Sequence, residues 1–213
     1  MPELSTKQKI VSVSIQLFNE HGLANVRLQQ IADEAGISVG NLAYHFRNKE
    51  AIVCAVHEEL AGEISEILST YRIFPNLLDF DNQLTKYFGF VQQYAFYYVD
   101  CVEVDRTCPE IVNFRRQHIP KMISQIRKRF DFNISRGLIR KEPRPGFYDT
   151  LAESIWVLIA FWVTQSLARG KALPLHQQNF KEAIWNQVYP HFTDKGIAEY
   201  EQLILPLFRA TAP

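Results

Sequence analysis

The residues best placed to do chemistry lie in the segment VGNLAYHF at positions 39–46. Asn41 is followed three and four positions later by Tyr44 and His45, so an amide, a phenol and an imidazole share one face of a short helix. Such groups can hydrogen-bond to base edges and phosphates in the major groove of DNA. The opposite face is apolar and consists of Val39, Leu42 and Phe46. The spacing therefore predicts a DNA-reading helix, although an ordinary helical hairpin in a protein core has the same pattern.

A second short helix is predicted immediately before this one. Its apolar residues fall at positions i, i+3, i+4 and i+7, and they are Leu28, Ile31, Ala32 and Ala35. Gly36 follows, where the end of a helix favours a residue that tolerates positive φ. Ser38 is a typical N-cap for the next helix. The two helices and the turn between them form a predicted helix-turn-helix.

The flanking segments extend this pattern. Upstream, apolar residues from Ile10 to Phe18 share one helix face, and Gly22 ends that helix. Downstream, Asn48 can cap a helix whose first turn holds Glu50, a charge that the helix dipole favours. Written as patterns, these segments are I-x-x-x-S-x-x-L-F-x-x-x-G and I-A-D-E-A-G-I-S-x-G-x-L-x-Y-H-F-x-x-K-E. With so many positions matched at fixed offsets, residues 10–56 resemble the TetR family of bacterial transcriptional regulators.

The resemblance implies a set of DNA-binding residues. Asn41 and Tyr44 are expected to hydrogen-bond to bases or phosphates, and His45 and Lys49 to phosphates. The full set is Arg27, Gln29, Ser38, Val39, Gly40, Asn41, Tyr44, His45 and Lys49. The sequence departs from the family pattern at Ala43, where the family usually has Tyr, and at Arg27, where it prefers Thr or Ser as a helix cap. Ala43 can still contact a thymine methyl group.

Length and composition indicate an ordinary soluble protein, which we expect to be cytoplasmic, and the helical periodicity along the chain predicts an all-α fold. The chain has 213 residues, of which 47% are hydrophobic and 22% charged, as in ordinary soluble domains. No signal-peptide pattern is present at the N-terminus, and the apolar run at 155–163 is too short to span a bilayer. We expect a three-helix helix-turn-helix domain at residues 1–50 and a larger helical effector-binding and dimerisation domain at 51–213, with about nine to ten helices in total.

Charge is balanced overall but unevenly distributed. The net charge is zero, and residues 1–50 hold five bases and five acids, so non-specific DNA affinity should be modest and its salt dependence shallow. Residues 51–110 contain ten acids and three bases, whereas residues 111–144 contain ten bases and two acids. We interpret the basic segment as solvated helix surface that pairs with the acidic one; a second nucleic-acid surface is the alternative.

A fourth helix is predicted from Lys49 to about Tyr71, and it would link the DNA reader to the larger domain. A strongly aromatic helix follows at residues 81–101. Its aromatic side chains either fill a core or line a ligand cavity, as the corresponding region does in TetR-like proteins. The expected ligand is small and apolar or aromatic. The predicted ligand-binding residues are Phe88, Val91, Tyr94, Phe96, Tyr98, Phe114, Met122, Trp156, Phe161 and Gln165.

The C-terminal part is predicted to form a homodimer interface. A helix at residues 148–168 is apolar nearly all round, which indicates burial on several sides. Further helices are expected at residues 177–188 and 194–208. TetR-like proteins dimerise through a four-helix bundle in this region. The predicted interface residues are Ile155, Leu158, Trp162, Phe180, Ile184 and Trp185.

Three cysteines, Cys54, Cys101 and Cys108, form an odd set without paired spacing. We expect reduced, mostly buried thiols rather than a disulfide framework or a zinc site. A redox-sensing role for Cys101 or Cys108 is an alternative, since such a role depends on surroundings that a sequence does not reveal. No cofactor or metal is predicted.

These features favour a dimeric regulator that binds an inverted-repeat operator in double-stranded DNA and, as a repressor, is released by a small molecule. A constitutive DNA-binding dimer without an effector is the alternative. An all-α enzyme using the aromatic pocket is the third reading, but the sequence has no nucleophile elbow, glycine-rich phosphate loop or metal-ligand spacing. We therefore expect no enzymatic activity and no membrane partner.

Overall fold

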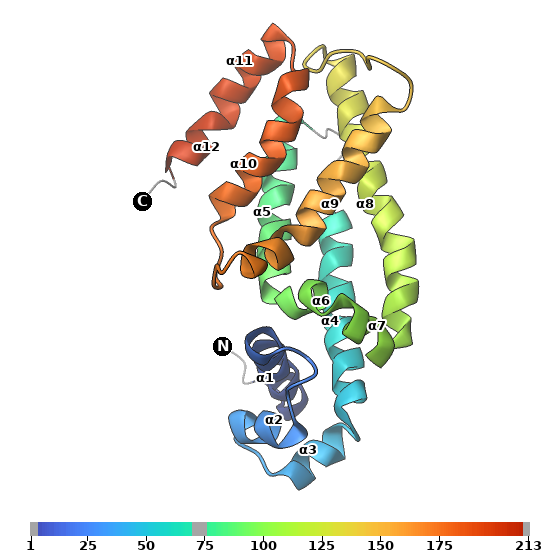
Figure 1. Cartoon of the computed structure of the whole chain (residues 1–213), viewed down its shortest axis with the longest axis vertical. Helices are drawn as coiled ribbons and strands as arrows, with labels where there is room; N and C mark the ends of the chain where they lie inside the picture. Colours follow the sequence, from blue (N-terminus) through green and yellow to red (C-terminus); the bar gives the residue numbers. More distant parts are fainter. Residues whose placement is uncertain (1–3, 70–75, 211–213) are drawn as a thin grey trace. The chain divides into compact units, whose positions relative to one another are not determined.

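The computed structural model describes residues 4–69 and 76–210, and these residues are helical with no strand, which confirms the all-α prediction. Ile139 and Phe192 form an isolated β-bridge. The helices are traced in Figure 1. Their bounds are α1 Thr6–His21, α2 Leu28–Ala35, α3 Val39–His45, α4 Lys49–Ser69, α5 Leu77–Gln93, α6 Ala95–Val99, α7 Cys101–Thr107, α8 Pro109–Ser135, α9 Phe147–Ala168, α10 Gln177–Val188, the 3-10 helix η1 Tyr189–His191, α11 Asp194–Leu203 and α12 Leu205–Ala210.

The chain packs as two compact units. The first comprises Met1–Ile64 with Gln93–Gln117, and the second comprises Ser65–Gln92 with His118–Pro213. The first unit therefore holds α1 to α3, most of α4, α6, α7 and the beginning of α8. These packing units differ from the predicted functional domains, a DNA-binding domain at residues 1–50 and an effector-binding and dimerisation domain at residues 51–213, and that functional division stays a prediction.

The predicted helix-turn-helix is present in the first unit. Gly36 ends α2 with φ 65° and ψ 36°, a left-handed conformation that favours glycine. Ser38 caps α3 by accepting a hydrogen bond from the backbone N–H of Asn41, 3.1 Å away. The apolar faces of the two helices are buried at Ile31, Ala32, Ala35 and Leu42. The sequence pattern located both helices and the turn because capping and periodicity are local properties.

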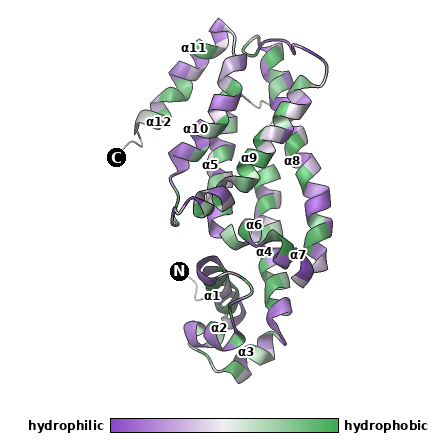
Figure 2. Ribbon diagram, viewed as in Figure 1, coloured by the Kyte–Doolittle hydropathy of each residue, from purple (hydrophilic) through white to green (hydrophobic). Residues whose placement is uncertain are grey.

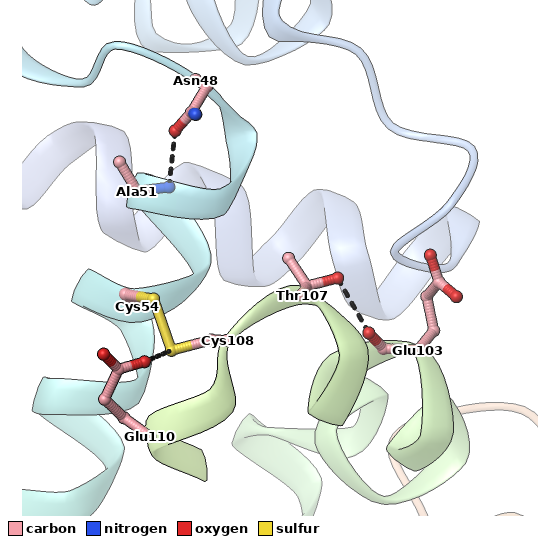
Figure 3. Close-up of a disulfide and its surroundings, with 7 residues drawn as sticks. All are labelled: Asn48, Ala51, Cys54, Glu103, Thr107, Cys108 and Glu110. Atoms are coloured by element: carbon pink, nitrogen blue, oxygen red, sulfur yellow. Dashed lines mark hydrogen bonds between the residues drawn. A yellow bond between two sulfur atoms is a disulfide. The ribbon is translucent and has the colours of Figure 1, made fainter. Parts of the chain in front are cut away.

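Helix α4 begins at Lys49 as predicted, and Asn48 caps it by accepting from the N–H of Ala51 at 2.9 Å (Figure 3). The predicted end near Tyr71 lies outside the described residues. Its apolar stripe is buried in the first unit at Ile52, Val56, Leu60 and Ile64.

The single aromatic helix predicted at residues 81–101 is in fact three helices. Helix α5 ends at Gln93, and α6 and α7 follow as short separate helices. Asn19 of α1 supports the first break, since its side chain donates to the Gln93 carbonyl at 2.8 Å and accepts from the Phe96 N–H at 2.9 Å. These bonds replace those that a continuous helix would make. The partner lies more than 70 residues away in the chain, so helical periodicity could not reveal the break.

The predicted helix at residues 194–208 is also broken, into α11 and α12. Pro206 stands in the first turn of α12, where its missing N–H interrupts the helical hydrogen bonding. The division of these two predicted helices into five explains why the described residues contain more helices than predicted. By contrast, α9 and α10 begin and end within a residue of their predicted limits.

The second unit has a well-packed aromatic and ionic interior. The rings of Phe130 and Tyr148 stack with centroids 4.8 Å apart. The basic segment pairs with the acidic segment only in part, for Arg129 of α8 binds Asp79 of α5 at 2.8 Å, whereas Arg136 binds Glu199 of α11 at 2.9 Å. In the first unit, Arg115 likewise binds Asp105 at 3.0 Å.

Helix α9 is the most apolar part of the second unit, as the colouring of Figure 2 indicates. Among the described residues it is the one helix long and apolar enough to cross a membrane, judged by length and composition only. This is weak evidence for a membrane span, because the core helix of a soluble protein passes the same test.

Candidate nucleic-acid interface

Helix α3 presents the predicted polar face to solvent. Tyr44 is 85% exposed, and Asn41 is exposed beside it. His45 is half-buried, and its ring meets that of Tyr44 edge-on with centroids 5.3 Å apart. The opposite side holds the helix in place, because Leu42 is fully buried and Phe46 nearly so. The result is a short, anchored helix with hydrogen-bonding groups pointing outward.

The start of α2 and the turn before α3 supply further predicted residues. Arg27 and Gln29 are exposed, and so are Ser38, Val39 and Gly40. The Arg27 N–H donates to the side chain of Gln30 at 2.8 Å, whereas the Arg27 side chain, which has no acceptor, makes no cap hydrogen bond to the first turn of α2. The Arg27 guanidinium is therefore not needed to cap α2. Seven of the nine predicted DNA-binding residues thus gather on α2, α3 and the turn between them, and Arg27 lies next to them as the N-cap residue of α2.

Lys49, the ninth, has a different environment. Its ammonium group donates to the carbonyl oxygens of Leu23 at 2.9 Å, Val26 at 3.1 Å and Ala24 at 3.4 Å. These three residues belong to the loop between α1 and α2, residues 22–27, which we call the α1–α2 loop. Lys49 therefore fixes the start of α4 to this loop. The sequence pattern predicted a phosphate contact for Lys49 and gave no indication of this structural role.

The same loop is held from a second side. The carboxylate of Asp100, between α6 and α7, accepts a hydrogen bond from the N–H of Leu23 at 2.8 Å. Leu23 is itself 1% exposed. The loop that leads into the helix-turn-helix thus has two supports, one from α4 and one from the α6–α7 junction. The sequence offered no signal for Asp100, whose partner lies 77 residues away.

The predicted ligand-binding residues of the first unit are packed closely. Tyr94 is fully buried, and its hydroxyl donates to Glu63 at 3.1 Å. Burial first, and then the charges of Glu63 and Glu59, raise the pKa of Tyr94 above its usual value. Phe96 is buried against the ring of Phe18 at 5.2 Å. The other two predicted residues here, Tyr98 and Phe114, are half-buried.

The predicted ligand-binding residues of the second unit also fill space. Phe88, Val91, Met122 and Trp156 are buried, Gln165 is half-buried and Phe161 is 56% exposed. A cavity beside Met122 and Trp156 measures about 10 Å³, far below the several hundred Å³ of a typical ligand pocket. A ligand at these two residues would therefore have to displace side chains.

A larger hollow in the second unit lies elsewhere, between α5, α10 and α12. It measures about 620 Å³. Its floor holds an ion pair between Lys181 and Asp81, whose carboxylate also accepts from the Trp185 indole at 3.0 Å. The lining residues are Asp81, Asn82, Thr85, His176, Gln177, Gln178, Asn179, Lys181, Leu207 and Phe208. Sequence reasoning missed this hollow because Asp81 and Lys181 are 100 residues apart.

The predicted dimer-interface residues divide by burial. Four of them are completely buried within the protomer and pack inside the second unit: Ile155, Phe180, Ile184 and Trp185. Leu158 and Trp162 are half-buried. The apolar side chains that α9 leaves exposed are Val157, at 62%, and Phe161. Because α9 turns its other apolar side chains inward, most of the predicted interface residues are not accessible to a partner. The apolar surface that α9 leaves accessible is formed by Val157 and Phe161.

The prediction of three reduced thiols is wrong. Cys54 of α4 and Cys108, between α7 and α8, form a disulfide with Cα atoms 5.8 Å apart (Figure 3). Cys101 is free. Pairing depends on distance in space, and a separation of 54 residues hides it in the sequence. Glu110 lies beside the pair, and the ligand atoms of Cys54, Cys108 and Glu110 are all within 4.8 Å of one another.

Comparison with known proteins agrees with this architecture. The HTH-type transcriptional regulator RutR from Escherichia coli (strain K12) is 41% identical over 54 residues, which are 25% of this chain and 26% of RutR. A TetR-family transcriptional regulator from Marinobacter aquaeolei VT8 has a similar crystal structure, with a TM-score of 0.80, 24% identity, and coverage of 99% of this chain and 100% of that chain. The SmeT–triclosan complex, of a Stenotrophomonas maltophilia repressor, has a TM-score of 0.54 and 15% identity over 90% of this chain and 93% of that chain.

The chain spans only 19% of the length of one curated Bacillus subtilis relative and 26% of that of RutR. Matches to whole protein families reach further. Residues 10–56 match the pattern of the bacterial regulatory proteins of the tetR family, and residues 59–200 match that of a bacterial transcriptional repressor. Because these two matches together extend over most of the described helices, the chain belongs to the TetR family of bacterial regulatory proteins.

Proposed function

We propose that the protein is a dimeric DNA-binding transcriptional regulator that acts as a repressor. The observation that carries this proposal is the anchored helix α3, with Leu42 buried on one side and Asn41 and Tyr44 exposed on the other. Family membership supports the same conclusion. This geometry suits insertion into a major groove, where amide and phenol groups can reach base edges.

In this proposal each protomer places α3 in one major groove of an inverted repeat. Two-fold symmetry of the dimer requires two half-sites separated by about one helical turn, roughly 34 Å, or a multiple of it. Arg27 and Arg47 are exposed at the two ends of the helix-turn-helix and are suited to phosphates. Lys49 contributes indirectly, because its ammonium group is occupied by the loop carbonyls. The partner surface is the exposed part of α9 around Val157 and Phe161.

The repressor would be released by a small apolar or aromatic effector. This fold holds a small molecule in the SmeT complex with triclosan. The tight packing at Met122 and Trp156 means that an effector at these predicted residues must open the side chains, and a constitutive DNA binder remains the alternative. An effector can shift the protein between two arrangements only if it binds them with different affinity. The site offers no catalytic constellation, and we propose a cytoplasmic protein without enzymatic activity.

Selection of bound duplexes from a random DNA pool, followed by sequencing, tests the proposal. The expected result is enrichment of an inverted repeat whose half-sites are one or two helical turns apart. A matched selection with Asn41→Ala should lose the enrichment, while Asn186→Ala, the same change at an exposed position of α10, should keep it. Recovery of a random pool by the unaltered chain at low salt would contradict the proposed function.

A further inference from the structure

We propose that Cys54 and Cys108 form a reversible redox site whose oxidant is a low-molecular-weight disulfide, and that its state controls how firmly the α1–α2 loop is held. The first observation is the disulfide itself, which joins α4 to the turn between α7 and α8 (Figure 3). The third cysteine, Cys101, does not take part. The consequence for DNA binding rests on the proposed function, whereas the redox site does not.

The surroundings of the pair suit both oxidation states. Glu110 Oε2 lies 3.2 Å from Cys108 Sγ, within hydrogen-bonding distance of a thiol. When the disulfide is reduced, the Cys108 thiol can donate a hydrogen bond to this carboxylate, so the buried thiol has a hydrogen-bond acceptor. When the bond is oxidised, no donor is left and the exposed carboxylate is hydrated instead. Neither the oxidised nor the reduced state leaves a buried polar group without a hydrogen bond at this contact. The contact therefore does not strongly favour one oxidation state of the cysteine pair over the other.

Accessibility decides where exchange begins. Cys108 is 0% exposed, whereas Cys54 is half-buried and can be reached from solvent. We therefore assign Cys54 as the sulfur that attacks the small disulfide during oxidation and that a small thiol attacks during reduction. Cys108 is the resolving cysteine.

The reaction is a balanced thiol–disulfide exchange. The Cys54 thiolate attacks one sulfur of a small disulfide, forming a mixed disulfide and releasing one small thiolate. Cys108 then attacks the Cys54 sulfur, forming the Cys54–Cys108 bond and releasing the second small thiolate. The two protons of the protein thiols pass to the two released thiolates, so the protein loses two electrons and the small disulfide gains two. Small thiols drive the same steps in reverse.

The position of the bond gives it a mechanical role. Lys49, at the start of α4, holds the carbonyl of Leu23, and Cys54 follows five residues later on the same helix. Asp100, at the start of α7, holds the N–H of Leu23, and Cys108 follows directly after α7. The disulfide therefore connects the far ends of the two supports of the α1–α2 loop. Oxidation closes a ring that runs from Leu23 through α4, the disulfide and α7 back to Leu23.

Closing this ring removes freedom from the two supports of the helix-turn-helix. With the bond open, α4 and α7 can separate without breaking a covalent bond, so the N–H of Leu23 should open to solvent more often. With the bond closed, the loop should exchange its amide hydrogens more slowly. A change in the rigidity of the helix-turn-helix alters the conformational entropy that it loses when it binds DNA. The affinity for DNA changes accordingly.

The test equilibrates the full chain in mixtures of reduced and oxidised glutathione, followed by acid quench, alkylation and mass spectrometry. We expect Cys54 and Cys108 to lose their alkylation together as the oxidised fraction rises, while Cys101 keeps its own. Hydrogen exchange at residues 22–26 should be slower in the oxidised protein. Cys54→Ser should abolish both responses, and Cys101→Ser, the matched control outside the pair, should keep them.

Operator affinity is measured on the same samples. We expect oxidised and reduced protein to differ by about fivefold or more, the lower end of usual coupling between sites, and Cys54→Ser to give one affinity in both buffers. If Cys54 and Cys108 are alkylated at every glutathione ratio, or if the reduced protein instead takes up one zinc ion per chain and resists oxidation, the redox site is refuted. DNA binding that is absent in both states while the thiols titrate as expected refutes the proposed function and leaves the redox site standing.

Discussion

The ammonium group of Lys49 donates to the carbonyl oxygen of Leu23, 2.9 Å away, and thereby fixes α4 to the loop that leads into the helix-turn-helix. Together with the contacts to Ala24 and Val26, this makes Lys49 a cap for three backbone carbonyl groups of this loop. Phosphate binding by Lys49 would compete with these bonds. The DNA-reading unit is thus held together by a residue that its sequence pattern also associates with DNA.

Replacing Lys49 with Met should lower the free energy of unfolding by about 2 kcal/mol, because charge-assisted hydrogen bonds to buried carbonyls are lost. Urea denaturation measures this change. Arg47→Met, at an exposed position two residues earlier, should alter the free energy of unfolding by less than about 0.5 kcal/mol. Equal stability of the two variants would show that Lys49 is not a structural cap.

Replacing Tyr44 with Ala should weaken operator binding about tenfold, equivalent to about 1.4 kcal/mol, and leave thermal stability nearly unchanged. The reason is that the side chain is 85% exposed and contributes little to packing. Fluorescence anisotropy with labelled operator measures the affinity, and calorimetry measures the stability. A large loss of stability at unchanged affinity would place Tyr44 in the fold rather than at the DNA.

Replacing Phe161 with Glu should convert the proposed dimer to a monomer, because it puts a charge in the middle of the exposed apolar surface of α9. Sedimentation equilibrium reports the mass. Val102→Glu is the control, since Val102 is similarly exposed, at 58%, but lies on α7. A dimer that survives Phe161→Glu would exclude this surface. Trp162 is less suited to the test, because it packs on the buried ring of Phe180 at 5.7 Å and its loss would disturb the fold.

Replacing Lys181 with Met should destabilise the second unit by about 3 kcal/mol, because it leaves the buried carboxylate of Asp81 without its cation. The double variant Lys181→Met, Asp81→Asn should lose less than the sum of the two single changes, since the two residues interact directly. Denaturant unfolding of the four proteins gives the coupling. Simple additivity would mean that the pair does not act as a unit.

Replacing Tyr97 with Phe should alter the response to alkali. Burial raises the pKa of Tyr97 to about 12, although Arg115 opposes the shift. The unfolded chain ionises this phenol near pH 10, so its contribution to the free energy of unfolding is unchanged below pH 10 and falls by up to about 3 kcal/mol as the pH rises toward 12. In Tyr97→Phe this part of the alkaline loss should be absent.

At neutral pH the same variant should be as stable as the unaltered chain or more so, because the buried Tyr97 hydroxyl has no hydrogen-bond partner among the described residues. Tyr200, whose pKa burial also raises to about 12, keeps its own share of the alkaline loss. Unfolding in urea at pH 8 and pH 11 measures both effects. A variant that loses stability at pH 8 would reveal a hydrogen bond at this hydroxyl.

The sequence alone determined the features that depend on neighbouring residues. The turn at Gly36, the N-cap Ser38 and the split of α3 into an apolar and a polar face follow from capping preferences and helical periodicity, which act over a few positions. The lengths of α9 and α10 were predicted for the same reason, as was membership of the family, whose pattern lies in one continuous stretch.

The tertiary structure decided everything that depends on residues distant in the chain. Asn19 supports the break that separates α5 from α6, and Asp100 and Lys49 hold the loop at Leu23. The hollow at Lys181 and the inward orientation of Trp185 were likewise not apparent from the pattern of apolar residues. Cys54 and Cys108 meet for the same reason. Their pairing is a matter of distance between folded helices, and no local spacing encodes such a distance.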